Sequence, residues 1–123
     1  MKRILLADAD SNLRSALGLI LETRLEAQIV GQATSMPELL QMMPQLQPDL
    51  VLMDWELSGK PLSPVGRVQT VRQMAPQVKV LIASIRPEVA ALINAADADG
   101  FINKSDLPEA ILAAFRLALT HHV

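Results

Sequence analysis

Residues 48–54 read PDLVLMD, a short apolar run that begins after a proline–aspartate pair and ends in a carboxylate. Residues 50–53 are all apolar, and four residues are too few for a helix. A short run without a polar position is typical of a strand buried on both faces of a sheet. Three further runs end in a polar residue in the same way: 4–7 before Asp8, 78–83 before Ser84, and 101–102 shortly before Lys104.

Segments with helical spacing lie between these runs. Leu13, Leu17 and Leu21 repeat every four residues, and Ser11 or Asn12 is the expected N-cap. Prolines predict the first turn of later helices: one from near Pro37, one over 64–75, one from Pro87, and a last one after an Asp106 cap. With residues 29–30 as a weaker strand, five strands alternate with five helices. This order predicts an α/β fold, a parallel sheet doubly wound with helices on both faces.

Composition and length limit the classes of protein that fit. The 123 residues suit one domain, 1–123, and half of them are apolar. The net charge is −2 and the eleven basic residues are scattered, so we expect no direct binding to nucleic acid or to an anionic membrane. No stretch approaches the roughly 20 apolar residues of a membrane span. Without cysteine, disulfides and thiolate metal sites are excluded. We expect a soluble, cytoplasmic domain.

The polar residues at the strand ends predict a functional site. In an open parallel sheet, ligands bind outside the carboxyl ends of the strands, so Asp8, Asp54, Ser84 and Lys104 should meet at one edge. Each alone has an ordinary explanation as a helix cap, a turn residue or a solvated lysine. Together they suit phosphoryl transfer, in which a carboxylate attacks, a hard cation and an ammonium neutralise charge, and a hydroxyl binds the phosphoryl oxygens.

Four motifs in order carry a resemblance to a known family. Residues 4–8, 48–54, 80–84 and 98–104 resemble the corresponding segments of response-regulator receiver domains of two-component signalling systems, over essentially the whole chain. The resemblance implies a flavodoxin-like sheet of order 2-1-3-4-5 and a signalling domain rather than an enzyme. It implies that a sensor histidine kinase phosphorylates Asp54, that Ser84 and Lys104 assist, and that the domain then switches conformation to control an output.

The resemblance also implies a magnesium site, and the sequence departs from the family pattern there. The expected ligands are Asp8, Asp54 and the main-chain carbonyl of Glu56. Ala9 stands where receivers have a second acid, so we expect weak Mg²⁺ binding, with Asp10 or the Glu56 side chain as substitutes through water. Other departures are Ser58 and Ser105 for prolines, Leu62 for a glycine, and Ile85 for a small residue.

These departures keep a second interpretation open. A pseudo-receiver would bind a partner without phosphoryl chemistry, and Ala9 and Ile85 favour it, whereas Asp54, Ser84 and Lys104 together favour a phospho-acceptor. A flavin-binding protein is disfavoured because no glycine-rich phosphate loop follows the first strand. The pair His121 and His122 lacks the further ligands that a metal site needs.

The last helix predicts a partner surface. It is apolar nearly all round, which indicates either a docking face or simply alanines that favour helix. We expect exposed Leu112, Phe115 or Leu119, and a face built from the helix at Pro87, the fifth strand and this helix. A homodimer or an output domain is the expected occupant.

Overall fold

The computed structural model describes residues 1–120, so His121 and His122 lie outside the described residues. One five-stranded sheet forms the centre, with all neighbouring strands parallel and the order β2-β1-β3-β4-β5. This confirms the predicted flavodoxin-like topology. The strands are β1 (Lys2–Ala7), β2 (Ala27–Ala33), β3 (Leu50–Asp54), β4 (Lys79–Ser84) and β5 (Gly100–Asn103).

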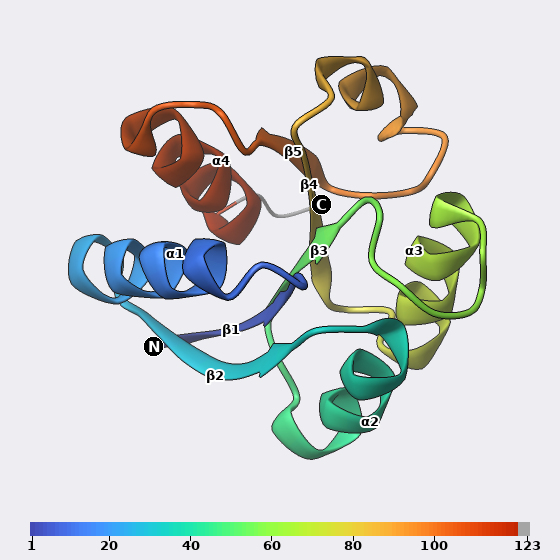
Figure 1. The fold of residues 1–123 in the computed structure, drawn as a ribbon. Helices are drawn as coiled ribbons and strands as arrows, with labels where there is room; N and C mark the ends of the chain where they lie inside the picture. The colour runs from blue at the N-terminus through green and yellow to red at the C-terminus, as the bar shows by residue number, and fades with distance from the viewer. Residues whose placement is uncertain (121–123) are drawn as a thin grey trace.

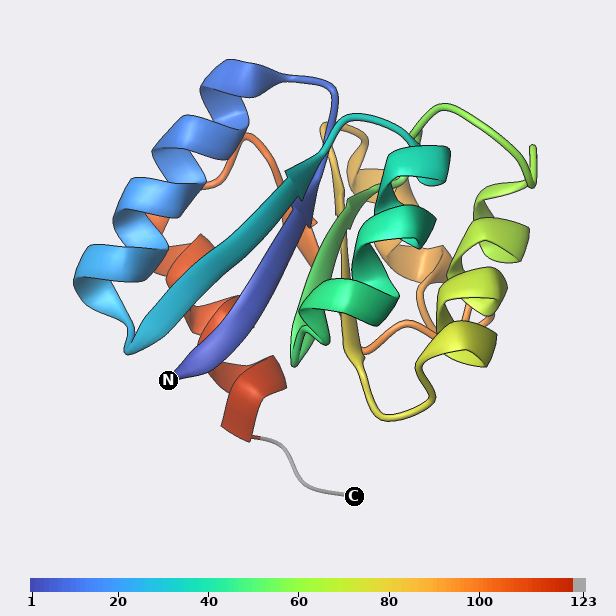
Figure 2. The same ribbon diagram turned by 90° about the horizontal axis from the view of Figure 1, so that it is seen from below.

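Helices cover both faces of the sheet, as Figures 1 and 2 show. Helices α1 (Ser11–Arg24) and α4 (Pro108–Thr120) lie on one face. Helices α2 (Met36–Leu46) and α3 (Pro64–Met74) lie on the other, together with the short segment η1 (Pro87–Leu92). None of the helices within residues 1–120 is long and apolar enough to cross a lipid bilayer.

The segment from Pro87, predicted as one of the five helices that alternate with the strands, is not an α-helix. The segment is a 3₁₀ helix, with i→i+3 bonds such as Val89 N–H to the Arg86 carbonyl. No side chain caps its start, and the chain leaves it through a left-handed residue, Asp97, with φ of 62°. A short, uncapped segment has too few residues to offset the cost of nucleating an α-helix, so the tighter turns prevail.

Helix caps also differ by a residue from the sequence expectation. Asp10, rather than Ser11 or Asn12, caps α1, because its Oδ1 accepts from the amides of Asn12 at 3.0 Å and Leu13 at 3.2 Å. At α4, the Leu107 carbonyl accepts the first helical bond, from the Ile111 amide. Leu107 therefore directly precedes the helix, and the expected cap, Asp106, lies one residue before it. Asp10 is therefore committed to the start of α1.

The hydrophobic core has two layers, one on each face of the sheet. Leu5 and Met53 point toward α2 and α3, whereas Ile4 and Leu52 point toward α1 and α4. Alternate side chains of β1 and β3 are therefore buried on opposite faces, which explains why residues 4–7 and 50–53 are all apolar.

The weaker second strand has a glycine, Gly31, at an irregular and crowded position. Strand β2 pairs with β1 through an irregularity that leaves Val30 unmatched between Ile29 and Gly31. A Cβ added at Gly31 would lie 2.6 Å from the Leu46 side chain and 2.9 Å from that of Leu5. A larger residue here would require these two leucine side chains to shift.

The final helix is amphipathic, which corrects the expectation of an unpartnered apolar surface. Leu112 and Phe115 are completely buried against the sheet and α1, and Leu119 is partly buried. Leu117, by contrast, is 69% exposed. The apolar stripe is therefore a core face, and only alanines, Leu117 and polar residues face outward.

This orientation of α4 predicts unequal effects of two substitutions in the same helix. Phe115→Ala should lower the free energy of unfolding by about 3–5 kcal/mol, because it opens a cavity in the core. Leu117→Ala, on the exposed side, should change it by less than about 0.5 kcal/mol. Urea denaturation measures both, and a larger effect of Leu117→Ala than of Phe115→Ala would show that α4 packs on its other face.

Candidate functional site

The four predicted polar residues come together at the carboxyl edge of the sheet. Asp8 follows β1 and Asp54 ends the adjacent β3, so the two carboxylates are neighbours. Lys104, from the end of β5, reaches across to them: its Nζ lies 2.6 Å from Asp8 Oδ2 and 3.3 Å from Asp54 Oδ1. One ammonium thus bridges two carboxylates at the edge where parallel sheets bind ligands.

Ser84 lies on β4, next to Asp54 in the sheet, and is almost completely buried. Its Oγ accepts a hydrogen bond from the Arg86 amide at 3.0 Å, which folds the chain after β4 back onto the strand end. No hydrogen bond joins Ser84 to Asp54 in this structure. Ile85, which follows, is 68% exposed, so most of its side chain faces solvent.

The environment of Asp54 disfavours its charge. Burial raises the pKa of the Asp54 carboxyl above its ordinary value. The Glu56 amide, which donates to Oδ1 at 3.2 Å, and the Lys104 ammonium oppose this only in part, while the Asp8 charge adds to it. Ionised Asp54 therefore has a higher free energy in the fold than in water, and additional positive charge would stabilise it.

At Lys104, in contrast to Asp54, the neighbouring groups favour the charged form more strongly than burial disfavours it. Burial lowers the pKa of its ammonium, but the hydrogen bond to Asp8 and the charges of Asp54 and Asp8 outweigh burial, and the net effect raises the pKa. Lys104 therefore stays positive at neutral pH. With both acids ionised, the cluster carries more carboxylate than ammonium charge.

The donor set fits a hard cation of limited affinity. Asp8 Oδ1 accepts from the Asp10 amide at 2.9 Å, and the buried Oδ2 faces the Lys104 ammonium at 2.6 Å. The carboxylates of Asp8 and Asp54 lie at the ends of adjacent strands, and carboxylate oxygens are the donors that a magnesium ion would use. Within residues 1–120, however, no three His, Cys, Asp or Glu side chains gather closely enough to form a metal cluster.

The two expected substitutes for the missing acid are engaged elsewhere. Asp10 uses its Oδ1 to cap α1, and its side chain is exposed. The Glu56 side chain lies 3.6 Å from the Arg86 guanidinium, on the surface. Neither side chain takes the place of a carboxylate at residue 9, which leaves Asp8 and Asp54 as the charged oxygen donors.

Sequence reasoning missed a buried arginine beside the site. Arg67 of α3 is 6% exposed, and its guanidinium donates to three main-chain carbonyls of the loop after β3: Trp55 at 2.6 Å, Leu62 at 2.7 Å and Pro61 at 3.1 Å. Position 67 lies four residues before the buried Val71, so helical spacing already placed it on the inner face. That spacing was the available signal.

The loop after β3 is also attached to α2. The Ser58 carbonyl accepts from the Met36 amide at 2.7 Å, and Gly59 has a left-handed φ of 109°. A Cβ at Gly59 would lie 2.7 Å from Pro37 Cδ, so this close approach requires glycine. Leu62, the residue in place of the usual glycine, is exposed and has an ordinary backbone conformation.

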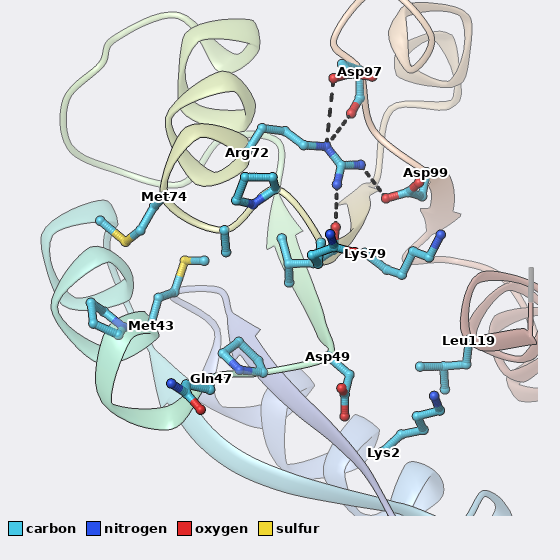
Figure 3. A pocket seen from close by; sticks show the side chains of 16 residues that line it. Lys2, Met43, Gln47, Asp49, Arg72, Met74, Lys79, Asp97, Asp99 and Leu119 are labelled. Carbon is cyan, nitrogen blue, oxygen red and sulfur yellow. Dashed lines mark hydrogen bonds and ion pairs between the residues drawn. The ribbon is translucent and has the colours of Figure 1, made fainter. Parts of the chain in front are cut away.

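A hollow of about 1090 Å³ lies at the opposite edge of the sheet (Figure 3). Arg72 stands on its wall and donates to the carbonyls of Val78 and Asp97 and to the Asp99 carboxylate. Asp97 and Asp99 pair with Arg72, and the hollow contains none of the residues of the acidic cluster.

Comparison with known proteins gives a consistent result. The family described as response regulator receiver domain matches residues 4–116. Transcriptional activator protein ExaE of Pseudomonas putida is 35% identical over 121 residues, which cover 97% of this chain and 56% of ExaE. Chemotaxis protein CheY of Thermotoga maritima is 27% identical over 115 residues, covering 92% of this chain and 93% of CheY.

A solved structure agrees. The crystal structure of a two-component response regulator of the LuxR family from Aurantimonas sp. SI85-9A1 superposes with a TM-score of 0.84 at 25% identity, covering 95% of this chain and 84% of that one. The chain thus spans little more than half of ExaE but most of the other two proteins.

The raised pKa of Asp54 predicts that removing its charge stabilises the folded protein, by an amount that depends on pH. The folded protein binds a proton at Asp54 more tightly than the unfolded chain, so ionisation costs stability as the pH rises through the raised pKa. Asp54→Asn should therefore raise the urea midpoint at pH 7. The gain should shrink as the pH falls and vanish below about pH 4, where the unfolded carboxyl is protonated as well.

Asp106→Asn, at an exposed carboxylate outside the cluster, is the matched control and should leave the midpoint unchanged. A lower midpoint for Asp54→Asn at pH 7 would mean that the Lys104 ion pair outweighs the cost of burial.

Proposed function

The chain belongs to the response regulator receiver domain family, and from that premise we propose that it accepts a phosphoryl group on Asp54 from a sensor histidine kinase. The observation that carries the proposal is the Asp54 carboxylate, which lies 3.3 Å from the Lys104 ammonium and beside Asp8 at the carboxyl edge of the sheet. We place this exchange in the cytoplasm, as the family resemblance implies.

In the proposed reaction, an Asp54 oxygen forms a bond to phosphorus while the bond from phosphorus to the donor's histidine nitrogen breaks. The nitrogen keeps the electron pair, and Asp54 becomes an acyl phosphate. The transferring oxygens carry negative charge, and the Lys104 ammonium is already positioned to neutralise part of it. The protein contributes position and electrostatics rather than a proton relay.

Magnesium is the proposed cofactor. Asp8, Asp54 and the main-chain carbonyl of Glu56 would hold it, and when bound it would supply the remaining positive charge at the transferring oxygens. The carboxylates of Asp8 and Asp54, side by side at the ends of adjacent strands, support this assignment. With two carboxylates, the proposed site is weak, and the ion would keep more of its waters.

Ser84 is the proposed switch. Its hydroxyl accepts from the Arg86 amide, but it donates to no group among residues 1–120. An acyl phosphate on the neighbouring strand would give that proton an acceptor and draw the loop after β4 inward. Phe101, partly buried on β5, is then free to follow. A few kcal/mol of such differential contact are enough to shift a two-state population.

The proposed output surface is the face formed by η1, β5 and α4. Leu92 on η1 is 44% exposed and Leu117 on α4 is 69% exposed, so apolar side chains remain available there. Leu112 and Phe115 are buried and do not contribute. We propose a second copy of the chain or an output domain as the occupant, and no direct contact with nucleic acid, because the domain has a net charge of −2.

A phosphorylation-independent interaction module is the alternative. Ala9 is consistent with it, but the convergence of Lys104 on both carboxylates favours the phospho-acceptor, because a binding surface has no need of two buried acids.

The proposal predicts one covalent phosphoryl group. Incubation with Mg²⁺ and acetyl phosphate or phosphoramidate should add one phosphoryl mass, as measured by mass spectrometry. Asp54→Asn should abolish the adduct, because the nucleophilic oxygen is lost. Asp49→Asn, at the opposite end of the same strand, should retain it. An unmodified wild-type protein would favour the interaction module, and a full adduct on Asp54→Asn would move the acceptor elsewhere.

The absence of an acid at position 9 predicts that introducing one there increases the affinity for Mg²⁺. Ala9→Asp should tighten Mg²⁺ binding by about tenfold or more, the size of change that single groups around metal sites commonly produce. Quenching of Trp55, which is buried directly after Asp54, measures the titration. Ala110→Asp adds the same charge at an exposed site on α4 and should not tighten binding. Equal curves for wild type and Ala9→Asp would remove Ala9 as the cause of weak binding.

A further inference from the structure

The Arg67 guanidinium lies underneath the loop that joins β3 to α3. Its Nη1 donates to the carbonyls of Leu62 at 2.7 Å and Pro61 at 3.1 Å, near the end of the loop. Its Nη2 donates to the Trp55 carbonyl at 2.6 Å, at the start of the loop. A single planar group thus holds both ends of the loop together, which a lysine ammonium could not do with the same geometry.

One peptide plane connects this guanidinium to the acceptor carboxylate. The Trp55 carbonyl and the Glu56 amide belong to the same peptide unit, which is planar and points its two polar groups in opposite directions. Arg67 binds the carbonyl, and Asp54 Oδ1 accepts from the amide at 3.2 Å. Fixing the carbonyl therefore fixes the direction of the amide that holds Asp54.

We propose that Arg67 is a positioning residue for phosphoryl acceptance, which orients the Asp54 carboxylate through the peptide between Trp55 and Glu56. This inference rests on the proposed function of Asp54. Arg67 touches neither the carboxylate nor the phosphoryl group, so its effect passes through the loop.

Two features of the loop explain why such a residue is needed. Ser58 replaces the proline of the family pattern, so this position lacks the restriction that proline places on the backbone. The Leu62 carbonyl is one of the three that Arg67 binds, and the Leu62 side chain contributes little packing because it is 81% exposed. Hydrogen bonds from the buried guanidinium supply the constraint instead.

Electrostatics support the same connection. Burial lowers the pKa of Arg67, and the charges of Asp54 and Glu56 oppose that change. The guanidinium stays positive in any case, because an arginine in a protein does not lose its proton near neutral pH. Helix α3 therefore places a permanent positive charge beneath the loop, within electrostatic range of Asp54.

Arg72 provides a matched control on the same helix. It also donates to main-chain carbonyls, those of Val78 and Asp97, but at the opposite edge of the sheet (Figure 3). Arg72→Met therefore removes a comparable guanidinium from α3 without touching the loop after Asp54.

The test compares Arg67→Met, Arg67→Lys and Arg72→Met by two measurements. The first is the chemical shift and hydrogen exchange of the Glu56 amide by NMR. The second is the initial rate of phosphorylation by acetyl phosphate with Mg²⁺. Arg67→Met should shift the Glu56 signal, speed its exchange and slow phosphorylation by about 10- to 100-fold, the effect expected of a misplaced reacting group. Arg67→Lys should lie between, and Arg72→Met should match wild type in both.

A role in stability alone would give a different pattern. If Arg67→Met and Arg72→Met slow phosphorylation equally, or if the Glu56 amide is unchanged in Arg67→Met, the inference is wrong. Should Arg67→Met fail to fold, Arg67→Lys decides by the same two measurements. If wild type itself accepts no phosphoryl group, the proposed function fails, and the Glu56 amide alone still decides whether Arg67 orients that peptide.

Discussion

The arrangement of the site depends on the Lys104 ammonium between Asp8 and Asp54. Two carboxylates at the ends of adjacent strands, both largely removed from water, would raise each other's free energy in the ionised form. Lys104 reaches them from β5, two strands away from β3, so its position depends on the register of β4 and β5. The order of the strands therefore determines the charge balance at the edge, and a different topology would leave the acids without a cation.

Around this ion pair, hydrogen bonds hold the two loops that follow β3 and β4. The loop after β3 is attached to α2 through Ser58 and to α3 through Arg67. The loop after β4 is folded back by the bond from the Arg86 amide to Ser84. The first loop accepts three hydrogen bonds from a buried guanidinium, whereas the second is held by the Ser84 hydroxyl and by the exposed pair of Arg86 with Glu56. The loop beside Asp54 is therefore held by a more buried group than the loop beside Ser84.

The sequence predicted the strands and the site because both follow from where apolar runs stop. Runs such as 50–53 are buried on both faces, and the polar residue that ends each one must lie at the carboxyl edge. Features that depend on tertiary contacts were not predictable in this way. The all-round apolar last helix turned out to bury Phe115 and expose Leu117, because the neighbouring sheet and α1 select one face. Arg67 carries a charge, and the carbonyls of the folded loop before α3 make its burial favourable.

The alanine at position 9 changes the charge of the cluster more than its shape. Asp8 is held by the Asp10 amide and by Lys104, neither of which needs a side chain at residue 9. With both acids ionised, the cluster has one negative charge in excess, whereas a second acid at position 9 would bring the excess to two. A smaller excess attracts a divalent cation less strongly, but it also repels an incoming phosphoryl group less. Loss of the acid would therefore weaken the proposed metal site and at the same time reduce the charge that the metal has to offset, so Ala9 by itself does not argue against the proposed phosphoryl acceptance on Asp54.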